Sequence, residues 1–386
     1  MDSIIDYIKT YGSRPIDVLP FTEVDSLILC QLSYLKYDGL LPAITDNKPG
    51  MTLAQLTEST GFEGLFEDKR YAKMNRALFL AASESRRFGQ MLLNNHINMV
   101  DSSWELQFSA MTFLFETGLF YLAYRGTDET LVGWKEDFNM ALFTPIPAQE
   151  KSLQYLNAIA RITHGKFLIG GHSKGGNLAV YASSKCHEDV QERILTVYNH
   201  DGPGFPQGTI PETVGFRRVA GRIRKYMPHS SIVGMLMESN EPYDIIECRK
   251  FGILQHDPFN WIVEGTAFRR VSNVYDHVAV KDASINRWIN EMTDEEKHVF
   301  VETLYSVLTA SGATTLLDFM TGWRFHSKAM YEAIEAADPK TKDLLMKIFA
   351  NLFDCLQDTM MIKVEEHIQP GWRKLKDVIE KWQDSD

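Results

Sequence analysis

The stretch Phe167–Tyr181 reads FLIGGHSKGGNLAVY. Its first four residues are mostly apolar and predict a buried strand, whereas its last five predict a helix. The residues between them, GHSKGG, fit the pattern G-x-S-x-G, in which a serine lies at a strained corner between a strand and a helix. Ser173 is therefore a candidate nucleophile, because the start of a helix favours negative charge nearby. The alternative is an ordinary glycine-rich turn, which requires neither His172 nor the second glycine, Gly176.

Apolar and β-branched runs on both sides of this stretch predict further strands. We expect them within 104–124, over 194–198 and 224–227, and at 245–248. Helical spacing predicts helices over 134–142, 149–163 and 211–223. Strands and helices that alternate in this way form a mostly parallel sheet with helices on both faces, and ligands bind outside the carboxyl ends of the strands. The sequence therefore predicts an α/β fold.

The two ends of the chain predict helices. Near the N-terminus, Thr22 and Asp25 fit a capping box, and helical spacing returns over 70–93. Beyond about residue 273 the strand signal is lost, and helical segments follow, one of them over 294–311. We expect an N-terminal helical segment over 1–100, an α/β core over 101–272 and a C-terminal helical region over 273–386. The last region fits a cap over the site, the surface of a homodimer or a plain bundle.

Composition limits the classes of function. A chain of 386 residues with 44% hydrophobic residues is long enough for a large core and an appendage. The net charge of -11, without any block rich in lysine or arginine, argues against nucleic acid as a partner.

Cysteine usage and the N-terminal sequence indicate the compartment. The four cysteines are scattered without metal-ligand spacing, so we expect neither a metal centre nor a disulfide framework. The chain begins with acidic residues where a signal peptide carries basic ones, and it has no apolar run of about 18 residues for a membrane span. We expect a cytoplasmic protein without a transmembrane segment.

A serine nucleophile requires a base within hydrogen-bonding reach and an acid that orients the base. In α/β-hydrolases these residues follow in the order serine, acid, histidine. His256 lies on a loop after the last core strand and is the first candidate for the base, with His229 and His200 as competitors.

Asp201 directly follows the strand after the elbow helix and is the first candidate for the acid. Asp244 is the second candidate and Asp257 the third, because neighbouring side chains on a loop such as Asp257 and His256 tend to point apart. An Asp-Gly pair is also common in turns, so Asp201 has a purely structural interpretation as well.

The segment Arg125-Gly126-Thr127-Asp128 follows a predicted strand at the same edge of the sheet. Serine hydrolases take the second donor of their oxyanion hole from such a loop. Thr127 is therefore a candidate donor, and the same residues also fit a turn that caps the next helix.

With these residues assembled, the chain resembles the class 3, fungal-type lipase superfamily of α/β-hydrolases, and more closely a bacterial branch of it. Tyr124–Thr127 is similar to the oxyanion-hole segment, Gly171–Gly176 to the nucleophile elbow, and Gln255–Pro258 to the histidine segment of the bacterial branch. The resemblance covers roughly 104–262. It implies an α/β-hydrolase fold in which the N–H groups of Thr127 and Lys174 hold the oxyanion.

Two departures from that pattern stand out. Lys174 occupies a position where these lipases usually carry leucine, and we expect its side chain to point to solvent. The segment Ser230–Val233 resembles the acid-bearing segment but has serine in place of the aspartate. Either the acid has moved to Asp201, or the triad is incomplete.

The sequence thus predicts a serine esterase or lipase that acts on a small or lipid-like acyl ester without a metal or an organic cofactor. The alternative, prompted by the altered acid segment, is a hydrolase-shaped binding or regulatory protein of little or no activity.

Overall fold

The structure is a computed structural model. It describes residues 2–46, 48–67, 71–127, 131–229, 231, 233–234, 237, 241–250, 252–272 and 293–309, together with 339 and 342. Most of these residues surround one sheet of eight strands, and the strands lie in the sheet in the same order as in the sequence.

The eight strands change from antiparallel to parallel pairing at β4. They are β1 (Met51–Thr52), β2 (Leu92–Asp101), β3 (Leu106–Leu114), β4 (Phe120–Tyr124), β5 (Phe167–His172), β6 (Ile194–His200), β7 (Ile223–Pro228) and β8 (Tyr243–Ile246). The pairs from β1 to β4 are antiparallel, and the pairs from β4 to β8 are parallel. This arrangement confirms the predicted α/β fold with a mostly parallel sheet.

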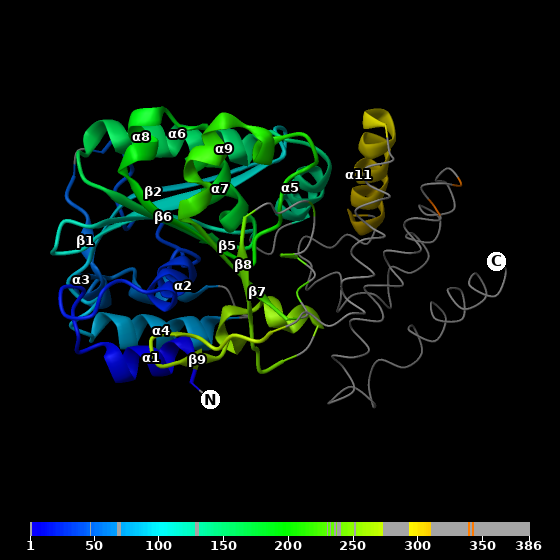
Figure 1. Ribbon diagram of the computed structural model, residues 1–386. Helices are drawn as coiled ribbons and strands as arrows, with labels where there is room; N and C mark the ends of the chain where they lie inside the picture. Colours follow the sequence, from blue (N-terminus) through cyan, green and yellow to red (C-terminus); the bar gives the residue numbers. More distant parts are fainter. Residues whose placement is uncertain are drawn as a thin grey trace.

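The strand order decides which face the crossover helices cover. Crossovers between parallel strands are right-handed, so a sheet whose strands follow each other in sequence order carries these helices on one face. Figure 1 shows α6, α7, α8 and α9 together on that face, and α1, α2 and α4 on the other. The helices on the crossover face are α5 (Leu131–Leu142), α6 (Pro147–Ile162), α7 (Lys174–Lys185), α8 (Glu188–Arg193) and α9 (Val214–Val219).

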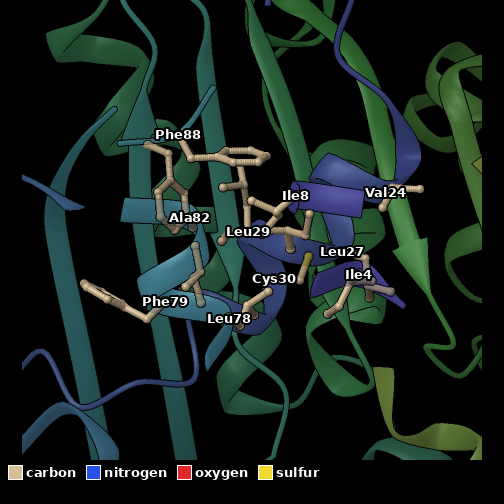
Figure 2. Packing of buried hydrophobic residues seen from close by; sticks show 14 of the residues in the cluster. Ile4, Ile8, Val24, Leu27, Leu29, Cys30, Leu78, Phe79, Ala82 and Phe88 are labelled. Atoms are coloured by element: carbon tan, nitrogen blue, oxygen red, sulfur yellow. The ribbon is translucent and has the colours of Figure 1, made fainter. Parts of the chain in front are cut away.

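The second face of the sheet is covered by helices from the N-terminal part of the chain. They are α1 (Ile4–Tyr11), α2 (Glu23–Leu32), α3 (Leu53–Thr57) and α4 (Ala72–Ser83). Side chains such as Leu27, Leu29 and Phe79 are fully buried there, and Figure 2 shows them packed together with neighbours from α1 and α4. The capping box at the start of α2 is confirmed, because Thr22 Oγ1 accepts from Asp25 N and the Asp25 carboxylate accepts from Thr22 N.

The helix expected over 70–93 is too long. Helix α4 ends at Ser83, and the residues from Leu92 onward form the ten-residue strand β2. Strand β2 is hard to recognise in the sequence, because asparagines interrupt its apolar pattern and an irregularity between Asn94 and Ile97 shifts its register against β3. The segment 1–100 therefore contributes strands to the sheet as well as helices.

Of the C-terminal helices expected beyond 273, one is among the described residues. Helix α11 (Asp294–Thr309) lies beside α5, where Lys135 pairs with Glu302 at 2.6 Å and the rings of Phe143 and His298 stack. The remaining expected helices fall outside the described residues. Within the described ranges, no helix is long and apolar enough to cross a membrane.

A buried ion pair ties the N-terminal helices together. Arg87 binds Asp25 through Nε at 2.7 Å and Nη2 at 2.5 Å, and both side chains are inaccessible to solvent.

We expect Asp25→Ala to lower the free energy of unfolding by about 3–5 kcal/mol, because Arg87 is left as an uncompensated buried charge. Urea denaturation measures the change. Glu63→Gln, which breaks an exposed pair with Arg76, is the control and leaves stability unchanged; equal effects of the two variants would contradict the interpretation.

Candidate active site

Ser173 lies at the corner between β5 and α7. Its backbone has φ 60° and ψ -135°, a conformation that costs a residue with a side chain about 1–3 kcal/mol and that clusters at functional sites. The turn after it is cramped, because a Cβ atom on Gly175 would lie 2.1 Å from the Tyr124 carbonyl oxygen at the end of β4. The strand, the turn and the helix predicted from the sequence are therefore all present, and the turn has the geometry of an elbow.

Asp201 lies directly after β6, at the same edge of the sheet. His172 and His200 are paired in the register of β5 and β6, so Ser173 and Asp201 each follow one member of that pair. The Asp201 side chain is fully buried, and its backbone φ of 55° is one that aspartate adopts more readily than most residues. The structure thus brings two of the predicted site residues to neighbouring strand ends.

His256 is the last residue of η4 (Gly252–His256) and meets Asp201. Its Nδ1 lies 2.7 Å from Asp201 Oδ2. Because a carboxylate only accepts, Nδ1 is the protonated nitrogen and Nε2 remains free to take a proton. Within the described residues, no hydrogen bond joins Ser173 Oγ to His256. Such bonds are often long in free enzymes and tighten when substrate binds.

His172, the residue before Ser173, holds the backbone of His256. Its Nε2 donates to the His256 carbonyl oxygen at 2.8 Å, and the centroids of the two rings are 4.6 Å apart. With Nε2 protonated, His172 Nδ1 accepts from the Tyr34 hydroxyl at 3.1 Å. Burial holds the pKa of His172 well below its usual range, so the ring is neutral at pH 7. The histidine loop is therefore bound directly to the nucleophile elbow.

The competing histidines have other partners. His200 Nε2 lies 2.8 Å from Ser26 Oγ of α2, on the face of the sheet covered by the N-terminal helices, and burial lowers the His200 pKa to about 3. His229 Nε2 lies 2.9 Å from the Gln255 side-chain amide. Among the residues that the structure describes, no hydrogen bond joins either of these two rings to the Asp201 carboxylate.

Among the described residues, no hydrogen bond joins either competing acid to the His256 ring. The Asp244 side chain is half exposed near the start of β8 and pairs with Arg270 at 3.0 Å. The Asp257 carboxylate accepts from the backbone N–H of Phe259 and caps a short helix.

Ser231 occupies the position where the resemblance to lipases leads one to expect the acid. Its hydroxyl donates to Asp201 Oδ1 at 2.5 Å and accepts from the Gly234 N–H at 2.9 Å. The two oxygens of the Asp201 carboxylate are thus both bound, one by His256 and one by Ser231. The serine supports an acid that comes from the neighbouring strand.

Thr127 follows β4 and approaches Ser173 from the other side. A Cβ atom on Gly126 would lie 2.6 Å from the His172 carbonyl oxygen and 3.0 Å from Ser173 Cβ, so this loop touches the elbow. The Thr127 hydroxyl donates to Asp137 Oδ1 of α5 at 2.6 Å. Thr127 lies where an oxyanion donor is expected, and its hydroxyl is engaged by a carboxylate.

The expectation that Lys174 points to solvent is wrong. Its side chain is 1% exposed, and Nζ donates to Glu136 Oε2 at 2.8 Å and to the Gln107 side-chain oxygen at 2.7 Å. An ammonium group that loses water must be paired, and the fully buried Glu136 supplies the opposite charge.

Sequence reasoning missed Glu136, Asp137, Tyr34 and Ser231. Glu136 and Asp137 lie in a predicted amphipathic helix, where acids are usually solvated. The one usable signal was the lysine within the elbow, because a buried lysine requires a buried acid nearby. Tyr34 carried no signal. Among the described residues, no three side chains of His, Cys, Asp or Glu are grouped as metal ligands.

The contact of Gly126 with the elbow is open to test. We expect Gly126→Ala to destabilise the protein by roughly 1–3 kcal/mol, because the new methyl group overlaps the Tyr34 hydroxyl and the His172 carbonyl oxygen. Gly221→Ala is the matched control, since nothing lies within 4 Å of a Cβ atom there. Denaturation in urea compares the two variants, and a stable Gly126→Ala protein would mean that the loop does not rest on the elbow.

Parts of this chain are similar in structure to known proteins. The solved structures that match this chain include two of the Rhizomucor miehei lipase propeptide complex. The deletion mutant has 13% identity and a TM-score of 0.33, with 52% of this chain and 69% of that chain covered. The native complex has 12% identity and a TM-score of 0.32, with 53% and 71% covered. The search of curated proteins finds no match.

A family model matches this chain and assigns it to a family. The model described as Mbeg1-like matches residues 82–306, a range that contains Thr127, Ser173, Asp201 and His256. Of the predicted relation to class 3 lipases, the match confirms the coarser part, a relation to a lipase-like family. Because the match covers more than half of the chain, this protein belongs to the Mbeg1-like family, which is a lipase-like family.

Proposed function

We propose that this protein is a serine hydrolase that cleaves carboxylic esters through an acyl-enzyme. The observation that carries the proposal is the 2.7 Å hydrogen bond between Asp201 and His256, beside a serine in a strained elbow. A buried carboxylate that fixes the Nδ1–H tautomer leaves Nε2 as a base for a serine hydroxyl. Membership of a lipase-like family supports the same class of reaction.

In the first half of the proposed reaction, Ser173 Oγ attacks the carbonyl carbon of the ester while His256 Nε2 takes the hydroxyl proton. The charge on the carbonyl oxygen is stabilised by the N–H groups of Thr127 and Lys174 and by the N-terminal end of α7. The alcohol then leaves with the proton from His256, and the acyl group remains on Ser173.

In the second half, water attacks the acyl carbon. His256 takes a proton from this water and returns it to Ser173 Oγ as the carboxylic acid leaves. Asp201 accepts from Nδ1 of His256 and stabilises the charged imidazole, and the hydroxyl of Ser231 donates to its second oxygen. No step uses a metal or an organic cofactor.

The substrate class is a small or lipid-like acyl ester. The buried free cysteines Cys30, Cys186 and Cys248 fit a reducing compartment, and we include a cytoplasmic location in the proposal. Short-chain esters, lysophospholipids and acyl thioesters are substrates that such a location would supply.

Hydrolysis of p-nitrophenyl esters of graded chain length tests the proposal. We expect Ser173→Ala, His256→Ala and Asp201→Asn each to lower kcat by at least about 10³-fold, because the three residues act as one unit.

Asp244→Asn is the matched control for the acid, because that carboxylate pairs with Arg270 and does not meet His256. It should keep the wild-type rate. If Asp201→Asn keeps the wild-type rate and Asp244→Asn loses it, the acid that orients His256 is Asp244 rather than Asp201.

A binding or regulatory protein remains the second candidate. It is favoured by the absence, within the described residues, of a hydrogen bond between Ser173 and His256. A folded wild type that turns over no ester of any chain length would support this second function over the first.

A further inference from the structure

The charge of Lys174 has no part in the proposed steps, yet its side chain is held on every side. Nζ donates to the Gln107 carbonyl oxygen at 2.9 Å, to Gln107 Oε1 at 2.7 Å and to Glu136 Oε2 at 2.8 Å. An ammonium group has three protons to donate. All three have a partner, so the side chain is fixed in one position.

These partners lie on the elements that surround the oxyanion segment. Gln107 belongs to β3, and Glu136 belongs to α5, the helix that follows Thr127 in the chain. Glu136 also accepts from the backbone N–H of Gln107 and from that of Ala148 at the start of α6, both at 3.0 Å. Lys174 thereby ties the elbow to β3, α5 and α6.

The next residue of α5 continues the link to Thr127. Asp137 Oδ1 accepts from the Thr127 hydroxyl at 2.6 Å and lies 3.9 Å from Lys174 Nζ. The loop then returns to the elbow, since Gly126 lies against Ser173. The result is a closed chain of contacts in which the residues that would supply both oxyanion N–H groups, Thr127 and Lys174, are connected through their own side chains.

We propose that Lys174 is a positioning residue for the oxyanion hole, which holds α5 through Glu136 so that Asp137 fixes Thr127 beside Ser173. This inference rests on the proposed function, because it assigns Lys174 a role in placing the two donors of that reaction.

Stability alone does not account for the pair. Replacing both members of a buried ion pair by apolar groups of similar size is often neutral or stabilising. A lysine and a glutamate buried next to a nucleophile are therefore better explained by what they hold in place than by a gain in folding energy.

The same contacts make the site sensitive to pH. Burial raises the pKa of Asp137 to about 6, the nearby charges of Lys174 and His256 lower it, and Glu136 raises it. Below about pH 6 the carboxylate gains a proton, and its hydrogen bond with Thr127 loses the strength that the charge provides. Lys174 Nζ lies 3.9 Å from Asp137 Oδ1, so its charge favours the ionised carboxylate and lowers the pKa of Asp137. Activity at low pH is lost as His256, the proposed base, and Asp137 each gain a proton. We expect removal of both charges to raise the pKa of Asp137 and to move the part of the acidic limb that depends on Asp137 to higher pH.

The double variant Lys174→Met, Glu136→Gln tests the proposal, because it removes both charges and keeps the volume of the side chains. For p-nitrophenyl acetate we expect kcat to fall about 10–100-fold with little change in KM, as misplaced catalytic groups produce. In a plot of kcat against pH, the acidic limb should shift to higher pH. Thermal denaturation should show that the double variant is folded. A merely structural pair would leave the limb in place.

Lys135→Met is the matched control. Lys135 lies on α5 next to Glu136 and pairs with Glu105 and Glu302. Neither of these partners belongs to the nucleophile elbow. We expect its kcat and its pH profile to equal those of the wild type. A folded double variant that also keeps the wild-type kcat and acidic limb overturns the proposal.

Two further measurements cover the other outcomes. If the double variant does not fold, Asp137→Asn replaces it, since this change keeps the ion pair and weakens the anchor of Thr127; an unchanged kcat would overturn the proposal. If wild type turns over no ester, the proposed function fails. NMR titration of the ¹³C-labelled Asp137 carboxyl, in wild type and in the double variant, then tests whether Lys174 and Glu136 act on Asp137. An unchanged pKa in the double variant overturns this link, whereas a raised pKa supports it.

Discussion

The candidate active site depends on the strained backbone at Ser173, which places the serine hydroxyl. A residue with a side chain adopts this conformation only where its surroundings hold it in place. Here β6 holds it from one side, since Ser173 N donates to the His200 carbonyl oxygen at 2.9 Å. Strand β4 holds it from the other side, because Tyr124 packs against Gly175 without space for a methyl group. Parallel pairing of three strands is thus a condition for the corner, and the corner places the hydroxyl at the edge where the neighbouring loops meet.

Consecutive strand ends supply the site. Thr127 comes after β4, Ser173 after β5, Asp201 after β6 and Ser231 after β7, and His256 reaches them from a later loop. Because the strands follow each other in order, residues far apart in the sequence come together at the carboxyl ends of neighbouring strands. The carboxylate that meets His256 therefore lies one strand closer to Ser173 than the resemblance to lipases implied, and Ser231 donates a hydrogen bond to it.

Local features of this molecule could be predicted from sequence, and features that depend on distant partners could not. The elbow and the capping box at Thr22 are local, because each is made by residues within a few positions of one another. The meeting of Asp201 with His256 was expected from chain order, from the position of each residue after a predicted strand, and from the resemblance of Gln255–Pro258 to a histidine segment. Burial of Lys174 was missed, because it depends on Glu136, which lies 38 positions earlier in the chain. Strand β2 was missed because its asparagines hide the alternation that predicts a strand.

The central claim is that Ser173 is a nucleophile activated by His256. The most direct measurement is the reaction of the full chain with a fluorophosphonate, followed by mass spectrometry of the peptides. The account predicts one phosphonyl group per chain, located on Ser173, and a much slower reaction in His256→Ala. A folded wild-type protein that takes up no label, or that takes it up at another residue, would contradict the account.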